Sequence, residues 1–126
     1  MSPRFDPAVA RSGPLVRGFA ADGGFLVEST THRALLMTPE RAWGWQPPAL
    51  ADLSEDDVAE ILAVEPPPEF LLLGTGVKLA RPPVAFVRAL EARGIGVEVM
   101  DSRAAARTWA VLRAEERWIS AALLAL

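Results

Sequence analysis

The sequence contains no cysteine and only one histidine, His32, and these two shortages remove several classes of chemistry. Disulfides, thiolate nucleophiles, iron–sulfur ligation and cysteine-based zinc sites are excluded. A general base needs a positioned partner and a nucleophile, and neither stands near His32 in its polar run, residues 29–33. We therefore interpret His32 as a surface loop residue. We expect no cofactor and no metal, since the carboxylates match no calcium-loop spacing.

Excess basic charge and long apolar runs are also missing. The formal net charge is -3, whereas nucleic-acid binding depends on clustered lysine and arginine, so no nucleic-acid partner is expected. The longest apolar stretch, residues 118–126, is about half the length of a membrane-spanning helix. Three prolines, Pro3, Pro7 and Pro14, would break an amphipathic targeting helix near the N-terminus. We expect a cytoplasmic protein with a loose N-terminus over residues 1–14.

The remaining residues are enough for one domain. The chain has 126 residues, of which 51% are apolar and 23% charged. A chain of this length and composition buries one core and has no room for a second. We expect a single α/β domain over residues 15–126.

The first part of this domain is predicted to be antiparallel β structure. Residues 15–20 and 25–28 form a hairpin around Asp22-Gly23-Gly24, and residues 34–37 form a further strand. A turn at residues 38–40 then leads to Trp43-Gly44-Trp45. Three or four strands thus precede the first helix, which Ser54 caps and the prolines at 66–68 end.

The second part has the pattern of a strand–helix–strand unit. The apolar run at residues 70–73 is typical of a central strand buried on both faces, with a parallel neighbour. Pro82-Pro83 opens a helix that Gly94 ends, and residues 97–100 form the next strand. Asp101-Ser102 caps a helix over residues 103–116, and residues 118–126 form a last strand, although residues 121–126 could equally be helical. The whole predicts a three-layer α/β domain with a mixed central sheet, an N-terminal antiparallel β portion and a C-terminal βαβ unit.

A candidate anion or ligand cleft lies where the predicted parallel strands end. Gly74-Thr75-Gly76 could form a nest of backbone N–H groups for an anion, or be only a tight turn. Arg103 and Arg107 stand one turn apart early in the last helix, where cations are disfavoured. Either an ion pair to Asp101 or Glu98, or an anion held between Arg107 and Thr75, would offset that cost. Both loops belong at the sheet's carboxyl edge, where open α/β sheets bind ligands.

Two tryptophans form a second candidate site. Trp43 and Trp45 are two residues apart, so on a strand they point to the same face. Such a pair is either an exposed aromatic platform for a partner or part of the core, and the core is the more frequent case.

The second half of the chain also resembles a known family. The residues that carry the resemblance are Leu71-Leu72-Leu73-Gly74-Thr75-Gly76, the prolines at 82 and 83, the stretch from Gly94 to Asp101, and Ala104-Ala105 with Arg107-Thr108. They are similar to a family of small uncharacterised domains that includes mitochondrial complex I assembly factor 3 and the adipogenesis-associated domain-containing protein. Members often have cysteine in place of Ala106, and Tyr-Asn in place of Trp109-Ala110, so any role of that thiol is lost here.

The resemblance implies a three-layer α/β fold and a role in assembly or protein interaction without established enzymatic activity. We therefore expect a non-catalytic interaction domain, accessory to respiratory complex I assembly, with respiratory subunits as partners. The alternative is a small-molecule or anion-binding domain, or a minor enzyme, that uses Thr75, Asp101 and Arg107.

Overall fold

The computed structural model describes residues 13–126. The expected loose N-terminus therefore falls mostly on residues 1–12, outside the described part. Pro14 is held in place, because its carbonyl accepts a hydrogen bond of 2.8 Å from the Trp109 indole. Gly13 packs on the backbone of Pro39.

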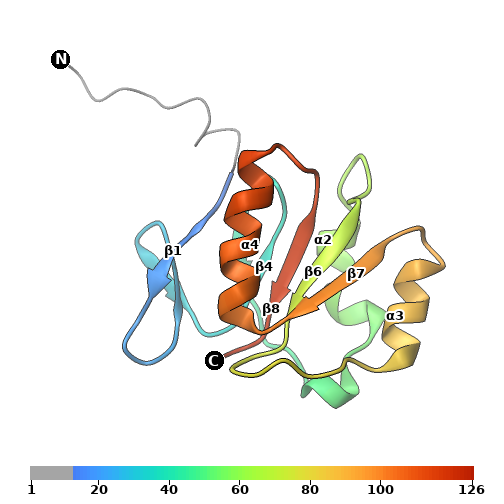
Figure 1. Cartoon of the computed structure of the whole chain (residues 1–126), viewed down its shortest axis with the longest axis horizontal. Coiled ribbons are helices and arrows are strands. Elements are labelled where there is room, and N and C mark those ends of the chain that lie inside the picture. The colour runs from blue at the N-terminus through green and yellow to red at the C-terminus, as the bar shows by residue number, and fades with distance from the viewer. Residues whose placement is uncertain (1–12) are drawn as a thin grey trace.

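A five-stranded mixed sheet forms the centre of the domain, in the order β5-β4-β8-β6-β7 (Figure 1). The strands are β4 (Leu35–Met37), β5 (Ala42–Gly44), β6 (Phe70–Gly74), β7 (Gly96–Met100) and β8 (Ser120–Leu123). β6 pairs in parallel with both β7 and β8, while β4 is antiparallel to β5 and β8. The predicted central parallel strand is thus confirmed, with a parallel neighbour on each side.

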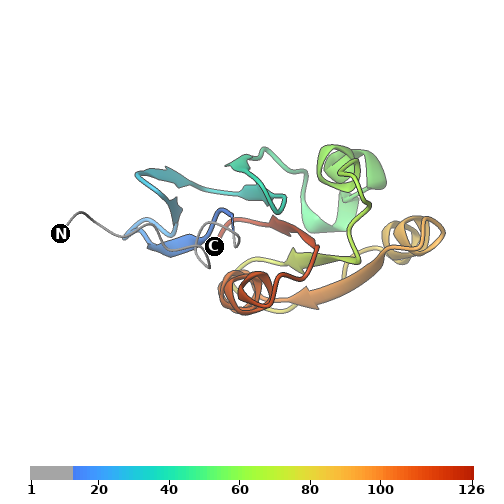
Figure 2. The same ribbon diagram turned by 90° about the horizontal axis from the view of Figure 1, so that it is seen from above.

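Helices cover both faces of this sheet, which gives the predicted three layers (Figure 2). α4 (Ser102–Ala114) lies on one face. The other face carries α2 (Ala59–Leu62), continuous with a 3₁₀ turn η2 (Glu55–Val58), and α3 (Val84–Glu91) lies near the β7 edge. A short 3₁₀ turn η1 (Leu50–Asp52) precedes them. At the start of η2 the Asp57 carboxylate accepts hydrogen bonds from the Ser54 backbone N–H and hydroxyl, as the cap pattern predicts.

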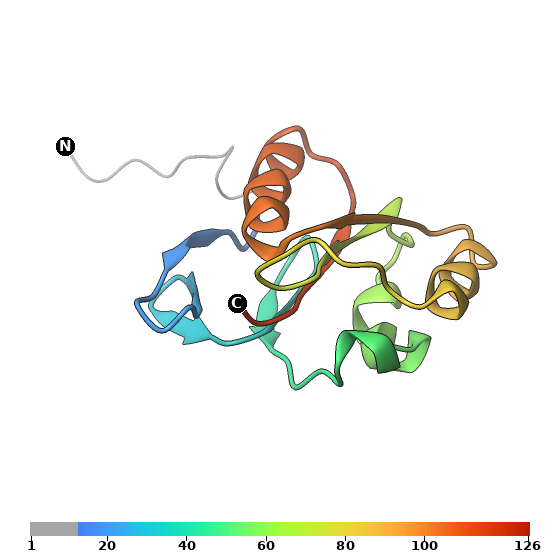
Figure 3. The ribbon, with the colours of Figure 1, turned by 60° about the horizontal axis from the view of Figure 1, so that its bottom comes forward.

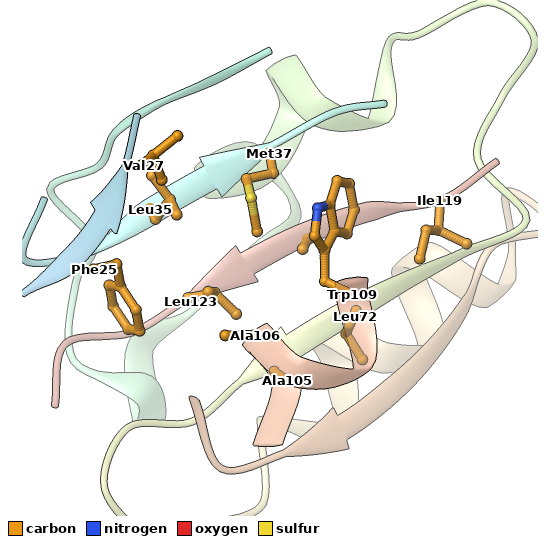
Figure 4. Packing of buried hydrophobic residues seen from close by; sticks show 11 residues of the cluster. Phe25, Val27, Leu35, Met37, Leu72, Ala105, Ala106, Trp109, Ile119 and Leu123 are labelled. Carbon is orange, nitrogen blue, oxygen red and sulfur yellow. The ribbon is translucent and has the colours of Figure 1, made fainter. Parts of the chain in front are cut away.

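The alternation of side chains along β6 divides the core into two clusters. Leu72 points toward α4 and packs with Trp109 and Ala105 (Figure 4). Leu71 and Leu73 point to the opposite face, toward α2 and α3. All three leucines are fully buried, as predicted for a strand covered on both faces.

A second sheet, β1-β2-β3, lies beside α4 (Figure 3). β1 (Val16–Phe19) and β2 (Phe25–Val27) form the predicted hairpin, and β3 (Thr30–His32) adds a third antiparallel strand. The interpretation of residues 29–33 as a loop, with His32 on it, was wrong. His32 is half-buried on β3, and its Nδ1 lies 3.1 Å from where a Cβ on Gly44 would stand. Five strands, rather than three or four, therefore precede the first helix.

Candidate functional site

The carboxyl ends of the three parallel strands meet at one edge of the central sheet (Figure 3). There the loop after β6 lies against the start of α4, as the sequence predicts. The Thr75 N–H donates to the Met100 carbonyl at 2.9 Å, and the Ser102 N–H donates to the Gly76 carbonyl at 2.8 Å. The structure therefore brings Gly74, Thr75 and Gly76 next to Asp101 and Ser102.

Ser102 closes this edge from within. Its hydroxyl is fully buried, accepts a hydrogen bond from the Gly76 N–H at 2.8 Å and donates to the Leu124 carbonyl at 2.7 Å. A Cβ added to Gly74 would stand 2.7 Å from the Ser102 Oγ and 2.8 Å from its Cα. Glycine at position 74 is thus required by the close approach of α4, and Ser102 ties together the three segments that follow the parallel strands.

The groups that could have formed an anion nest are already hydrogen-bonded. The N–H groups of Thr75 and Gly76 both donate within the protein. The Thr75 hydroxyl donates to the Lys78 carbonyl at 2.7 Å and accepts from the Ala80 N–H at 3.1 Å. Gly76 has a φ of +103°, which favours glycine. Of the two interpretations of Gly74-Thr75-Gly76, the geometry supports the structural turn.

Asp101 stays at this edge, whereas Arg103 and Arg107 of α4 face the N-terminal sheet. Asp101 is the N-cap of α4, where its Oδ1 accepts the Ala104 N–H at 2.9 Å. The Arg103 guanidinium lies 5.4 Å from the Phe19 ring centroid, and Arg107 lines a pocket beside β1. Within residues 13–126, Arg107 forms no ion pair with Asp101 or Glu98 and no hydrogen bond to Thr75. The ion pair predicted for Arg107 does not form within the described residues, because positions 103 and 107 face the N-terminal sheet, and the anion alternative stays a prediction.

Trp43 and Trp45 point to the same side, as predicted, but they belong to the core. Both indoles are half-buried and pack against the cluster under α2 and α3. The Arg41 guanidinium covers the Trp43 ring at 4.3 Å from its centroid. The interpretation as core residues fits this placement better than an exposed platform does.

A charged cluster that the sequence did not reveal lies at the opposite edge of the sheet. The Glu69 carboxylate pairs with the Arg117 guanidinium at 3.0 Å and accepts the Trp118 N–H at 3.1 Å. The hydrogen bonds from Arg117 hold the pKa of Glu69 below its usual value. Among residues 13–126, no group of three or more histidine, aspartate or glutamate side chains is placed to hold a metal ion.

Three strongly exposed apolar side chains belong to the segment between β6 and the first turn of α3. Val77, Leu79 and Val84 are 61%, 67% and 64% exposed. Leu79 also lines a pocket of about 490 Å³, together with residues 80–82 and Val99 of β7. We call this region, Val77, Leu79, Val84 and strand β7, the β7-edge surface. A sequence signal existed, because Val77 and Leu79 are apolar residues in a loop outside any periodic element.

The fold and the site define a small α/β domain that closes the carboxyl edge of its sheet with its own side chains and leaves β7 open. The chain belongs to the family described as protein of unknown function (DUF498/DUF598), whose model matches residues 19–124. No helix among the described residues is long and apolar enough to cross a membrane.

Known relatives agree with this assignment. An uncharacterised protein of Rhodobacter capsulatus is 34% identical over 98% of this chain and 93% of its own length. The zebrafish (Danio rerio) NADH dehydrogenase [ubiquinone] 1 alpha subcomplex assembly factor 3 is 29% identical over 91% of this chain, which spans 66% of that protein. The solution structure of a Bordetella pertussis protein described as a Mth938-like domain has a TM-score of 0.77 and 32% identity, and the match covers 99% of this chain and 92% of that one.

Proposed function

We propose that the chain is a non-catalytic protein-interaction domain, accessory to the assembly of a respiratory NADH dehydrogenase. The observation that carries the interaction role is the β7-edge surface. It combines three exposed apolar side chains, of which Leu79 shares a pocket with Val99, with a five-residue strand that has a neighbour on one side only. Exposed apolar side chains are a common feature of interaction surfaces, and an unpaired strand edge offers backbone groups to a partner.

The carboxyl edge of the sheet supports the same proposal. Ligand-binding α/β domains keep polar groups available at this edge. Here the polar groups of Thr75, Gly76 and Ser102 form hydrogen bonds within the chain. This geometry disfavours the alternative of a small-molecule or anion site built on Thr75, Asp101 and Arg107.

The link to respiratory assembly rests on relatives. Assembly factor 3 is named for the alpha subcomplex of NADH dehydrogenase, and this chain spans only part of that protein. We extend the role to this chain as a proposal, with respiratory subunits as partners. The cytoplasmic location expected from the sequence stays a prediction.

Affinity capture from the native organism, followed by mass spectrometry, tests the proposal. We expect NADH dehydrogenase subunits with the wild-type chain and their loss with the double variant Val77→Ser/Leu79→Ser. Val111→Ser is the matched control, because Val111 is a similarly exposed side chain (58%) on α4. Failure to recover such subunits, or equal recovery with both variants, would overturn the proposal.

A further inference from the structure

Strand β1 lies on the side of α4 away from β7 (Figure 1). A small pocket lies between β1 and α4. One wall is strand β1 (Val16–Phe19), and the other is formed by Ala106, Arg107 and Ala110 of α4. Its volume is about 250 Å³. Arg17 and Arg107 are the charged residues among those that line the pocket, and the other lining residues are apolar.

In the described part of the chain, the pocket collects positive charge without a counterion. Arg17 and Arg107 are both exposed and line the same pocket, and the Arg103 guanidinium lies 5.4 Å from the ring centroid of Phe19, another lining residue. Within residues 13–126, no acidic residue lines the pocket and none of the three arginines forms an ion pair. The chain as a whole is acidic, with a net charge of -3, so this concentration is local.

The guanidinium groups and apolar side chains of the pocket indicate the kind of ligand that fits it. Guanidinium groups bind carboxylates through paired, charge-assisted hydrogen bonds, and like charges held close together favour an anion between them. Val16 and Phe19 offer an apolar surface beside those groups. Small-molecule sites usually occupy about 300–1,000 Å³, so this pocket has the size of one or two side chains rather than of a whole cofactor.

We propose that this pocket, the arginine pocket, binds an acidic segment of a protein partner. A glutamate or aspartate carboxylate lies between Arg17 and Arg107, and a neighbouring apolar side chain packs on Phe19. The inference rests on the proposed function in one respect only, that the ligand belongs to a protein. It does not depend on the β7-edge surface or on respiratory subunits.

Nuclear magnetic resonance on the ¹⁵N-labelled full chain tests the proposal. The probe is a hexapeptide of alternating glutamate and leucine, and the control peptide has glutamine in place of glutamate. We expect the acidic peptide to shift the amide signals of β1 and of residues 106–110, and the glutamine peptide to leave them unchanged. The variant Arg17→Gln/Arg107→Gln should bind roughly tenfold or more weakly, because it loses two charge-assisted contacts.

Arg88→Gln is the matched control, since Arg88 is an exposed arginine on α3, and it should bind like the wild type. An unchanged spectrum elsewhere shows that each variant is folded. Equal binding of both peptides, or undiminished binding by the double variant, would overturn the proposal. Inorganic phosphate that shifts the same signals at lower concentration than the peptide would indicate a free-anion site instead. Binding only to vesicles containing phosphatidylserine would indicate a membrane surface, and either result also overturns the proposal.

Discussion

Replacement of Ser102 by alanine should destabilise the domain strongly, although it removes a single oxygen atom. The Ser102 hydroxyl is fully buried and serves the Gly76 N–H at 2.8 Å and the Leu124 carbonyl at 2.7 Å. Without it, one buried donor and one buried acceptor lose a partner, each at about 1–3 kcal/mol. With partial relaxation of the loop we expect a loss of about 2–4 kcal/mol in the free energy of unfolding.

Urea denaturation measures this loss directly, as a midpoint lower by about 1–2 M for a domain of this size. Ser29→Ala is the control, because Ser29 is exposed in the turn between β2 and β3, and it should stay within about 0.5 kcal/mol of the wild type. If Ser102→Ala also stayed within that range, the edge would not be held by this side chain. The polar groups at this edge would then be available to a ligand.

Three further predictions concern stability. Leu72→Ala should cost about 2–5 kcal/mol in urea denaturation, because Leu72 is fully buried on the central strand; an unchanged midpoint would contradict the sheet order. Gly74→Ala should cost about 1–3 kcal/mol or more by the same assay, since its Cβ would lie 2.8 Å from the Cα of Ser102 in α4; a stable variant would show that α4 can move away. The lowered pKa of Glu69 predicts that its ion pair stabilises the folded domain. This stabilisation is complete above the pKa that Glu69 has in the unfolded chain, and it is lost as the pH falls through the lower pKa of Glu69 in the folded domain. Removal of its partner by Arg117→Gln should bring the Glu69 pKa, followed by a carboxyl-carbon NMR titration, back toward its usual value, and no change would contradict the pair.

The strand–helix–strand unit was predictable because its signals are local. The apolar run Leu71-Leu72-Leu73 and the proline pair at 82 and 83 predict strand and helix from adjacent residues alone. Gly94 ends its helix with a φ of +79°, a conformation that glycine adopts without strain. The fold class therefore followed from the sequence.

The position of β8 in the sheet and the existence of β3 escaped prediction, because both depend on contacts between distant parts of the chain. β8 lies between β4 and β6, a position set by pairings such as Leu36 with Ala122 and Leu72 with Ala121. β3 carries exposed polar side chains, so no apolar alternation marks it as a strand. Its structure comes from pairing with β2.

The loop after β6 and the start of α4 lie together as the sequence predicts, whereas the contacts of Ser102 and Arg107 differ from those expected. Sequence reasoning brought the loop after β6 to the start of α4, but it assigned Ser102 only a capping role. It also gave Arg107 a partner at the sheet edge, whereas β1 lies opposite that face of α4. Which groups are already hydrogen-bonded, and what a helix face meets, are decided by tertiary packing.

The most direct test of the interaction role is the level of assembled NADH dehydrogenase in the native organism after deletion of the gene for this chain. Native gel electrophoresis with an activity stain would compare complementation by the wild type, by Val77→Ser/Leu79→Ser and by Val111→Ser. We predict that the wild type and Val111→Ser restore the assembled complex and that the double variant does not, although it is folded and present at the same level. Equal assembly in the deletion strain and the wild type, or full rescue by the double variant, would contradict the account.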